Sequence, residues 1–327
     1  MLPTSLPNAA RLDDDATAVI RELSKLLAQP SGDLPSVRCL SRSTLFSLLR
    51  RIRTDLQARG SKHRLAHSHV LARLMQMGLV TPVPLHASET GKPTVPLYLI
   101  EVGASAIKEL DPIELLVAAE PQGIVCYFSA LNVHQLTTQP CAHHHVARLS
   151  RVAAGRKVAA RSPAARRTDR APGRSYNPLG TAMFSYRGLT YYRTFRDPGL
   201  LVSYQQRFLD PHTRFRVTTL EQTLIDTLHR PLSCGGPAVV FEAWETALER
   251  LEDGRMAAIL QQIGRQEVVR KVGWMLEACG YTAGAELAGV LIEAREGVDP
   301  TASQGLPPLL PGFENPRTDH RWQLQVP

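Results

Sequence analysis

The stretch RVTTLEQTLIDTLHRPLSCGG, residues 216–236, contains the start and end signals of one short helix. Thr218 and Glu221 have the spacing of a capping box, in which two side chains satisfy free backbone N–H groups at a helix start. Thr219 and Gln222 have the same spacing. The apolar residues that follow share one helical face: Leu220, Leu224, Ile225 and Leu228. A His-Arg-Pro sequence then predicts the end of the helix.

Two acidic residues in this stretch, Glu221 and Asp226, raise the question of an active site. Glu221 falls in the first helical turn, where the helix dipole favours a negative charge, so we interpret it as a helix cap. Asp226 lies outside the first turn, so the helix dipole does not explain an acid at this position. We expect it to bind a neighbouring backbone group or an arginine. Because no metal ligand or activated nucleophile lies nearby in the sequence, we predict no catalytic site here. A nuclease that uses both acids is the alternative.

The length and composition predict a two-domain cytoplasmic protein. With 327 residues, the chain is long enough for two hydrophobic cores. Its N-terminus lacks the basic-then-apolar pattern of a signal peptide, and no apolar run reaches the length of a membrane span. The five cysteines are scattered without a CxxC spacing, which is typical of reduced thiols. We therefore expect no membrane partner.

The positive charge of the chain is concentrated in two segments. Residues 36–77 and residues 148–174 each contain nine Lys and Arg residues against one Asp, and the whole chain has a net charge of +8. The remainder therefore carries −8. This asymmetry indicates a protein with a polyanion-binding end. The second segment, a loop near 148–177, is open to two interpretations. In the first, it binds DNA or an acidic partner without specificity. In the second, which we favour, it is a solvated insertion.

The first basic segment also has the element order of a winged helix-turn-helix. Helical spacing is found over residues 13–29, 43–59 and 64–77, and two extended stretches surround a turn at 88–92. The apolar faces of the second and third helices are Leu45, Leu48, Leu49, Ile52 and Leu56, and Val70, Leu71, Leu74 and Met77. We therefore predict a winged helix-turn-helix DNA-binding domain with a leading helix in residues 1–105.

In such a domain the second helix of the pair enters the major groove and the hairpin follows the DNA backbone. We expect the polar face of the helix at 64–77 to contact base edges. Arginines on the preceding helix and a lysine in the turn suit phosphate contacts. The predicted DNA-binding residues are Arg50, Arg51, Lys62, Arg64, His67, Ser68, His69, Arg73, Gln76 and Lys92. A small helical domain with a solvated basic face is the alternative.

Residues 106–327 are expected to form a second domain, which combines α and β elements before it becomes helical. A short strand or helix start is predicted at 124–128, a hairpin at 182–195, and helices throughout 236–292. The final residues, HRWQLQVP, are compatible with one edge strand. The predicted fold class is therefore α+β and mostly helical.

A cysteine and three histidines, Cys141-Ala-His143-His144-His145, suggest a metal site. However, three consecutive histidines cannot all reach one ion from a strand or a helix, so we interpret residues 141–145 as a loop. The sequence contains no phosphate-binding glycine loop, dinucleotide-binding glycine pattern, nucleophile elbow or zinc-protease motif. We accordingly predict no metal, no cofactor and no enzymatic activity.

Three segments resemble the AbiEi family of antitoxins from type IV toxin–antitoxin, or abortive infection, systems. The opening stretch resembles a family helix of the form T-x-x-E-x-T-L-x-D, followed by a short break and a glycine pair. VVRKVGWMLEACGY, residues 268–281, resembles the family's RRLGYLLE…G helix. VCYFSALNVHQLTTQ, residues 125–139, resembles its Y-x-S-x-x-S-A-L-x-x-H-G-L stretch, with Gln135 where a glycine is usual.

This resemblance implies a repressor and antitoxin that is not an enzyme. Members of the family pair an N-terminal winged helix, which binds DNA upstream of the operon, with a C-terminal domain that counteracts an AbiEii nucleotidyltransferase toxin. Residues 1–105 would then bind the protein's own promoter, and residues 106–327 would neutralise the toxin, directly or only functionally. A stand-alone winged-helix regulator, whose C-terminal domain senses a ligand or a protein, is the alternative.

Overall fold

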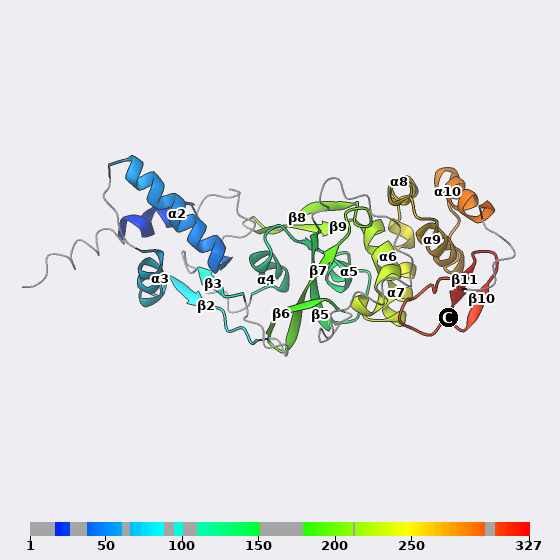
Figure 1. The fold of residues 1–327 in the computed structure, drawn as a ribbon, viewed down its shortest axis with the longest axis horizontal. Coiled ribbons are helices and arrows are strands. Elements are labelled where there is room, and N and C mark those ends of the chain that lie inside the picture. The colour runs from blue at the N-terminus through cyan, green and yellow to red at the C-terminus, as the bar shows by residue number, and fades with distance from the viewer. Residues whose placement is uncertain are drawn as a thin grey trace, which may run out of the picture. The chain divides into compact units, whose positions relative to one another are not determined.

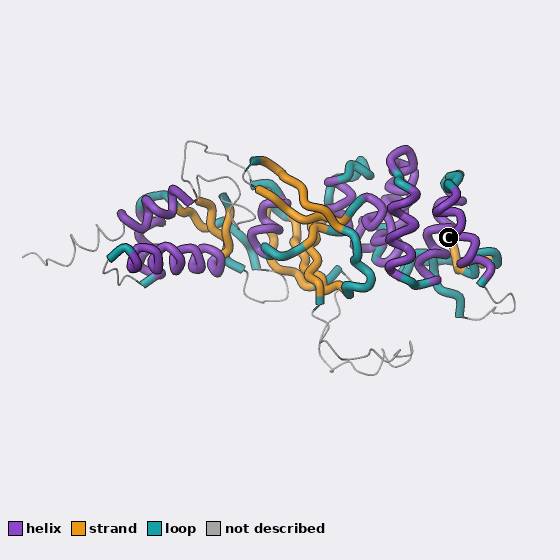
Figure 2. The backbone as a smooth tube through the Cα atoms, turned by 90° about the horizontal axis from the view of Figure 1, so that it is seen from above, coloured by secondary structure: helices purple, strands orange, loops and turns teal. Residues whose placement is uncertain are grey.

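Helices and strands occur in both of the compact units into which the chain divides, so the fold is mixed α and β (Figures 1 and 2). The computed structural model describes residues 17–26, 38–60, 66–87, 95–100, 110–150, 179–211, 213–297 and 305–327. Unit 1 contains Met1–Gln122, Met183–Gly188 and Gln206–Phe215. Unit 2 contains Gly123–Ala182, Leu189–Gln205 and Arg216–Pro327.

Unit 1 opens with a helix and a small sheet that enclose one core. Its elements in chain order are helical residues 17–26, β1 (Cys39–Ser41), α2 (Arg42–Ala58), α3 (His67–Gln76), β2 (Val80–Pro82), β3 (Leu97–Ile100) and α4 (Pro112–Ala119). The three strands pair antiparallel in the order β1-β3-β2. The structure confirms α2, α3 and the pairing of β2 with β3. Strand β1 is too short to show an alternation pattern in the sequence.

The core of unit 1 forms because α2 and α3 each bury one apolar face. The Ser41 hydroxyl caps α2 by accepting a hydrogen bond from the Thr44 N–H at 3.2 Å. All five apolar residues predicted for α2 are buried, and so are three of the four predicted for α3. The prediction for Met77 is wrong, because this residue follows the last helical residue and is 50% exposed.

A buried ion pair fixes α4 next to β1. The Glu114 carboxylate, which is fully buried, accepts hydrogen bonds from the Arg38 guanidinium, with 3.0 Å between Nε and Oε1. Asp111 caps α4 by accepting from the Ile113 N–H at 2.7 Å. Helix α4 belongs to unit 1, and the predicted domain boundary between residues 105 and 106 lies outside the described residues.

A mixed six-stranded sheet follows in the chain. Its strands are β4 (Ile124–Val125), β5 (His143–Leu149), β6 (Thr181–Tyr186), β7 (Leu189–Arg196), β8 (Tyr204–Asp210) and β9 (Thr213–Thr218), in the order β6-β7-β5-β4-β9-β8. β5 pairs parallel with β7 and β4 pairs parallel with β9, whereas β4 and β5 are antiparallel. Helix α5 (Tyr127–Val133) follows β4 directly. The predicted strands at 182–195 are confirmed as β6 and β7.

The histidine triplet belongs to a central strand, so the predicted loop over residues 141–145 is wrong. β5 begins at His143, and its pairing with β7 holds the triplet in extended backbone. His145 is fully buried and stacks on Tyr192, with ring centroids 5.3 Å apart. His144 is buried on the opposite face, 4.8 Å from the Tyr191 ring. The described residues contain no group of three or more side chains suited to a metal ion.

Residues 220–296 of unit 2 form a helical region, as predicted for residues 236–292. Its elements are α6 (Leu220–His229), η1 (Pro231–Cys234), α7 (Pro237–Ala247), η2 (Leu248–Arg250), α8 (Asp253–Ile263), α9 (Gln266–Ala278) and α10 (Ala285–Glu296). Trp244 is fully buried in their core and donates to the Thr227 hydroxyl at 3.0 Å. The predicted tail strand is β11 (Leu324–Val326), which pairs with β10 (Arg317–Asp319). No helix in the described part of the chain is both long enough and apolar enough to cross a membrane.

The tail of the chain packs on α9 through Trp322. A Cβ atom on Gly273 would lie 2.2 Å from the Trp322 ring, so only a glycine allows this approach. The indole N–H donates to Glu277 Oε2 at 2.7 Å and fixes the ring in this position. Helix α9 therefore keeps a glycine in its interior for a packing reason.

We expect Gly273→Ala to destabilise the protein, although alanine is the better helix former by about 1 kcal/mol. The added methyl group would displace the Trp322 ring, and such overpacking costs about 1–3 kcal/mol. Gly289→Ala in α10, where an added Cβ would contact no described neighbour, is the matched control and should stabilise. Urea unfolding measures both variants. A stabilised Gly273→Ala protein would contradict the packing described for Trp322.

We also expect the stability to fall as the pH falls from about 6.5 towards 4. Burial, and then the charge of His143, lowers the pKa of His144 to about 4, whereas the unfolded histidine binds its proton near pH 6.5. The unfolded state therefore binds more protons in this window. His144→Phe keeps a ring against Tyr191 and should reduce the slope by at most about 1.4 kcal/mol per pH unit. Unfolding free energies measured at several pH values test this, and an unchanged slope would count against it.

Candidate nucleic-acid interface

The polar face of α3 is exposed as a direct result of its apolar face being buried. Val70, Leu71 and Leu74 lie in the core, and helical spacing then turns the remaining side chains outward. The exposed residues on this helix include Ser68, His69, Arg73 and Gln76. Arg73 Nη1 donates to Gln76 Oε1 at 3.5 Å, one helical turn away. The helix thus presents hydroxyl, imidazole, guanidinium and amide groups, all of which can bind base edges or phosphates.

His67, at the start of α3, is half-buried and faces α2. Its ring centroid lies 5.9 Å from that of Phe46. Partial burial, followed by the positive charges of Arg53 and Arg50, lowers the pKa of His67. The imidazole is therefore neutral near pH 7 and has both a donor and an acceptor nitrogen. Such a group suits a base edge or a sugar better than it suits a phosphate.

Helix α2 adds positive charge beside the start of α3. Arg50 and Arg51 are exposed. Because Arg50 acts electrostatically on His67, the two predicted groups lie near each other. Seven of the predicted residues are thus described, all of them on α2 and α3: Arg50, Arg51, His67, Ser68, His69, Arg73 and Gln76. Lys62, Arg64 and Lys92 lie outside the described residues, and so does the basic segment from residue 151 to residue 178.

The acidic residues of α6 do not form a catalytic pair. Thr219 caps the helix by accepting from the Gln222 N–H at 3.4 Å, so the prediction that Glu221 is the cap is wrong. Glu221 is instead buried, with Oε2 3.8 Å from Arg255 Nη1. Residues five apart on a helix do not face each other, and Asp226 has a different set of partners.

Asp226 is fully buried and is held by an arginine, as the sequence predicts. Asp226 Oδ1 accepts from Arg196 Nη2 at 2.8 Å and from Gln222 Nε2 at 3.0 Å. Arg196 Nη1 donates to the Tyr127 hydroxyl oxygen at 2.7 Å. Burial raises the pKa of Tyr127, so the phenol stays neutral beside the ion pair. This cluster joins β7, α5 and α6, and nothing in the local sequence identifies Arg196 as the partner of Asp226.

Comparison with known proteins gives a likeness in fold only. No family model matches the chain, and no curated protein matches it. Among solved structures, the chain is similar to the crystal structure of the RV2827C protein from Mycobacterium tuberculosis, with a TM-score of 0.49 and 16% sequence identity. The likeness covers 95% of this chain and 90% of that one.

We expect Asp226→Asn to destabilise the protein by about 3–5 kcal/mol, because it leaves the buried Arg196 guanidinium without its counter-ion. Tyr127→Phe is the matched control, since it removes one hydrogen bond to the same guanidinium and should cost only about 1 kcal/mol. Urea unfolding of both variants provides the measurement. Equal losses in the two variants would show that the charge of Asp226 is not what stabilises the cluster.

Proposed function

We propose that the protein is a DNA-binding transcriptional autorepressor and an antitoxin that counteracts a nucleotidyltransferase toxin of the AbiEii type. The observation that carries the DNA-binding part is the exposed polar face of α3, on a helix held by three buried apolar side chains. A rigid helix with such a face can read the major groove. Arg50 and Arg51 on α2 would contact phosphates.

The element order of unit 1 supports a winged helix-turn-helix in residues 1–105. A leading helix, β1, α2, α3 and the antiparallel pair of β2 and β3 follow one another as in that class of domain. The charge of residues 36–77 supports the same assignment, because a basic surface attracts DNA whatever its sequence. We assign DNA binding to this end of a cytoplasmic protein.

The antitoxin part rests on the resemblance of three segments to the AbiEi family. We assign it to residues 106–327 and propose no enzymatic activity for them. The buried ion pair of Asp226 supports an architectural role for the stretch at 216–236. The toxin would be neutralised through direct contact or only through a functional effect. A stand-alone regulator that senses a ligand is the second candidate, and a pocket in unit 2 favours it.

We expect Arg73→Ala to weaken binding to the protein's own upstream DNA by about 1–3 kcal/mol and to reduce discrimination against a scrambled duplex. Arg51→Ala should weaken binding to both duplexes equally, because a phosphate contact does not depend on the base sequence. It should also reduce the slope of the logarithm of the binding constant against the logarithm of the salt concentration by about one. Fluorescence-anisotropy titrations across a salt series measure both effects.

The control for these titrations is Arg321→Ala, which removes an exposed arginine of the tail and should leave DNA binding unchanged. Full-strength, fully selective binding by Arg73→Ala would rule out α3 as the recognition helix. Equal and weak binding of the unmodified protein to both duplexes would argue against a specific repressor.

A further inference from the structure

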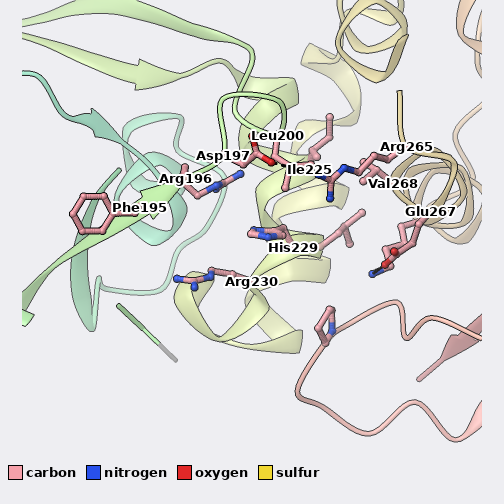
Figure 3. Close-up of a pocket in the computed structure, with 13 residues that line it drawn as sticks. Phe195, Arg196, Asp197, Leu200, Ile225, His229, Arg230, Arg265, Glu267 and Val268 are labelled. Carbon is pink, nitrogen blue, oxygen red and sulfur yellow. Dashed lines mark hydrogen bonds and ion pairs between the residues drawn. The ribbon is translucent and has the colours of Figure 1, made fainter. Parts of the chain in front are cut away.

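Unit 2 contains a pocket of about 420 Å³ that the proposed DNA-binding surface does not use (Figure 3). Its walls come from the end of β7 and the loop after it, from the C-terminal end of α6, and from the first turns of α9. A volume of this size suits a small molecule, since ligand pockets measure about 300–1,000 Å³.

One side of the pocket is formed by Arg196, His229 and Arg230 (Figure 3). Arg196 is 3% exposed and is fixed by its bonds to Asp226 and Tyr127, so one guanidinium is already oriented before any ligand arrives. Its Nε atom is buried and has no hydrogen-bond partner among the described residues. Buried N–H groups of this kind are nearly always bonded, and a ligand oxygen would satisfy this one.

Arg230 differs from the other cations that line the pocket. Lys271 pairs with Glu267 at 2.8 Å, and Arg265 lies 3.4 Å from Asp197. Arg230 has no acidic partner within the described ranges, and its Nη1 atom is buried without a hydrogen bond. Its charge is therefore the one that the lining leaves uncompensated. A guanidinium in this condition binds phosphate oxygens strongly, because each bond is charge-assisted.

The neighbouring groups favour an anion further. Desolvation in the pocket wall, and then the charges of Arg196 and Arg230, lowers the pKa of His229 to about 3. The imidazole is therefore neutral near pH 7 and can donate one hydrogen bond to a ligand oxygen. The first turn of the 13-residue helix α9 contributes Glu267 and Val268 to the lining, so the positive end of its dipole lies at the pocket.

The remaining lining is apolar and suits an organic group. Leu200, Ile225 and Val268 contribute aliphatic surface next to the cations. A ligand with a charged head and a flat or apolar body would fill both parts.

We propose that this pocket binds a small organic phosphate of mononucleotide size, with the phosphate between Arg230 and Arg196 and the organic part against Leu200 and Val268. This assignment goes beyond the proposed function and does not rest on it, because the DNA-binding residues lie in unit 1.

The test is isothermal titration calorimetry of the full-length protein with adenosine monophosphate, adenosine and inorganic phosphate. We expect adenosine monophosphate to bind at one site, at least tenfold more tightly than adenosine, because the charged group supplies most of the affinity. Inorganic phosphate should bind more weakly than the nucleotide. Equal affinity for phosphate and nucleotide would show that the anion alone is recognised and would overturn the organic part of the proposal.

Two variants locate the site. Arg230→Gln and His229→Gln should each weaken adenosine monophosphate binding, the first by about tenfold or more, which is the effect of losing a charge-assisted bond. His229 is an exposed residue, so its variant tests the site even if Arg230→Gln were to fold poorly. Arg321→Ala is the matched control and should bind like the unmodified protein.

Three outcomes would overturn the proposal. They are no heat of binding from the nucleotide or from phosphate at millimolar concentration, equal affinity for adenosine and its monophosphate, and unchanged binding in both pocket variants. None of them would bear on DNA binding, which is measured separately through α3.

Discussion

The buried ion pair between Arg196 and Asp226 is the interaction on which the organisation of unit 2 depends. Both charges are removed from water, so each is tolerable only while the other stays in place and the remaining polar atoms find partners. Gln222 extends the cluster, because its side-chain oxygen accepts from the Val202 and Ser203 N–H groups and its amide donates to Leu200. The cluster thereby holds together β7, the loop after it, α5 and α6. That loop, β7 and α6 are also walls of the pocket, so the pair orients the cations that face a ligand.

Arg196 of unit 2 and the arginines on α2 and α3 of unit 1 have opposite environments. In unit 2 the guanidinium of Arg196 is buried and paired with Asp226, so its main role is to stabilise the fold. On α2 and α3 of unit 1, Arg50, Arg51 and Arg73 are exposed above a conventional apolar core. Exposed cations on a rigid helix can follow a DNA backbone at little cost in desolvation, and their effect declines with salt. In the proposed function, arginine therefore supports the fold at Arg196 and attracts DNA on α2 and α3.

The sequence predicts the helices that depend on local periodicity. It does not predict helix ends, caps and buried polar residues that depend on contacts with distant parts of the chain. The apolar spacing of α2 and α3 is enough to assign both helices, whereas Met77 fits that spacing but lies beyond the helix end. Glu221 and Gln222 both have capping-box spacing, and the helix begins at Leu220, so Thr219 caps it through the Gln222 N–H. The histidines of β5 look like a polar loop because their burial depends on Tyr191 and Tyr192, almost fifty residues away. Gln135 adopts a φ of 56°, a left-handed conformation that glycine adopts most easily and that no local pattern predicts for glutamine.

The pocket illustrates the same limit, because its cations are separated in sequence and meet only through the fold. Arg196 comes from β7, Arg230 follows α6 and Lys271 lies within α9. Their charges do not simply add, since Asp226, Glu267 and Asp197 compensate most of them. A lining with so little uncompensated charge suits one phosphate group rather than a polyanion, which needs a row of accessible cations. Geometry leads to the same conclusion: a recess of about 420 Å³ can enclose a mononucleotide but cannot follow a duplex backbone. DNA binding therefore requires a row of exposed arginines, whereas small-anion binding requires an enclosed one. The exposed arginines of α2 and α3 suit only DNA binding.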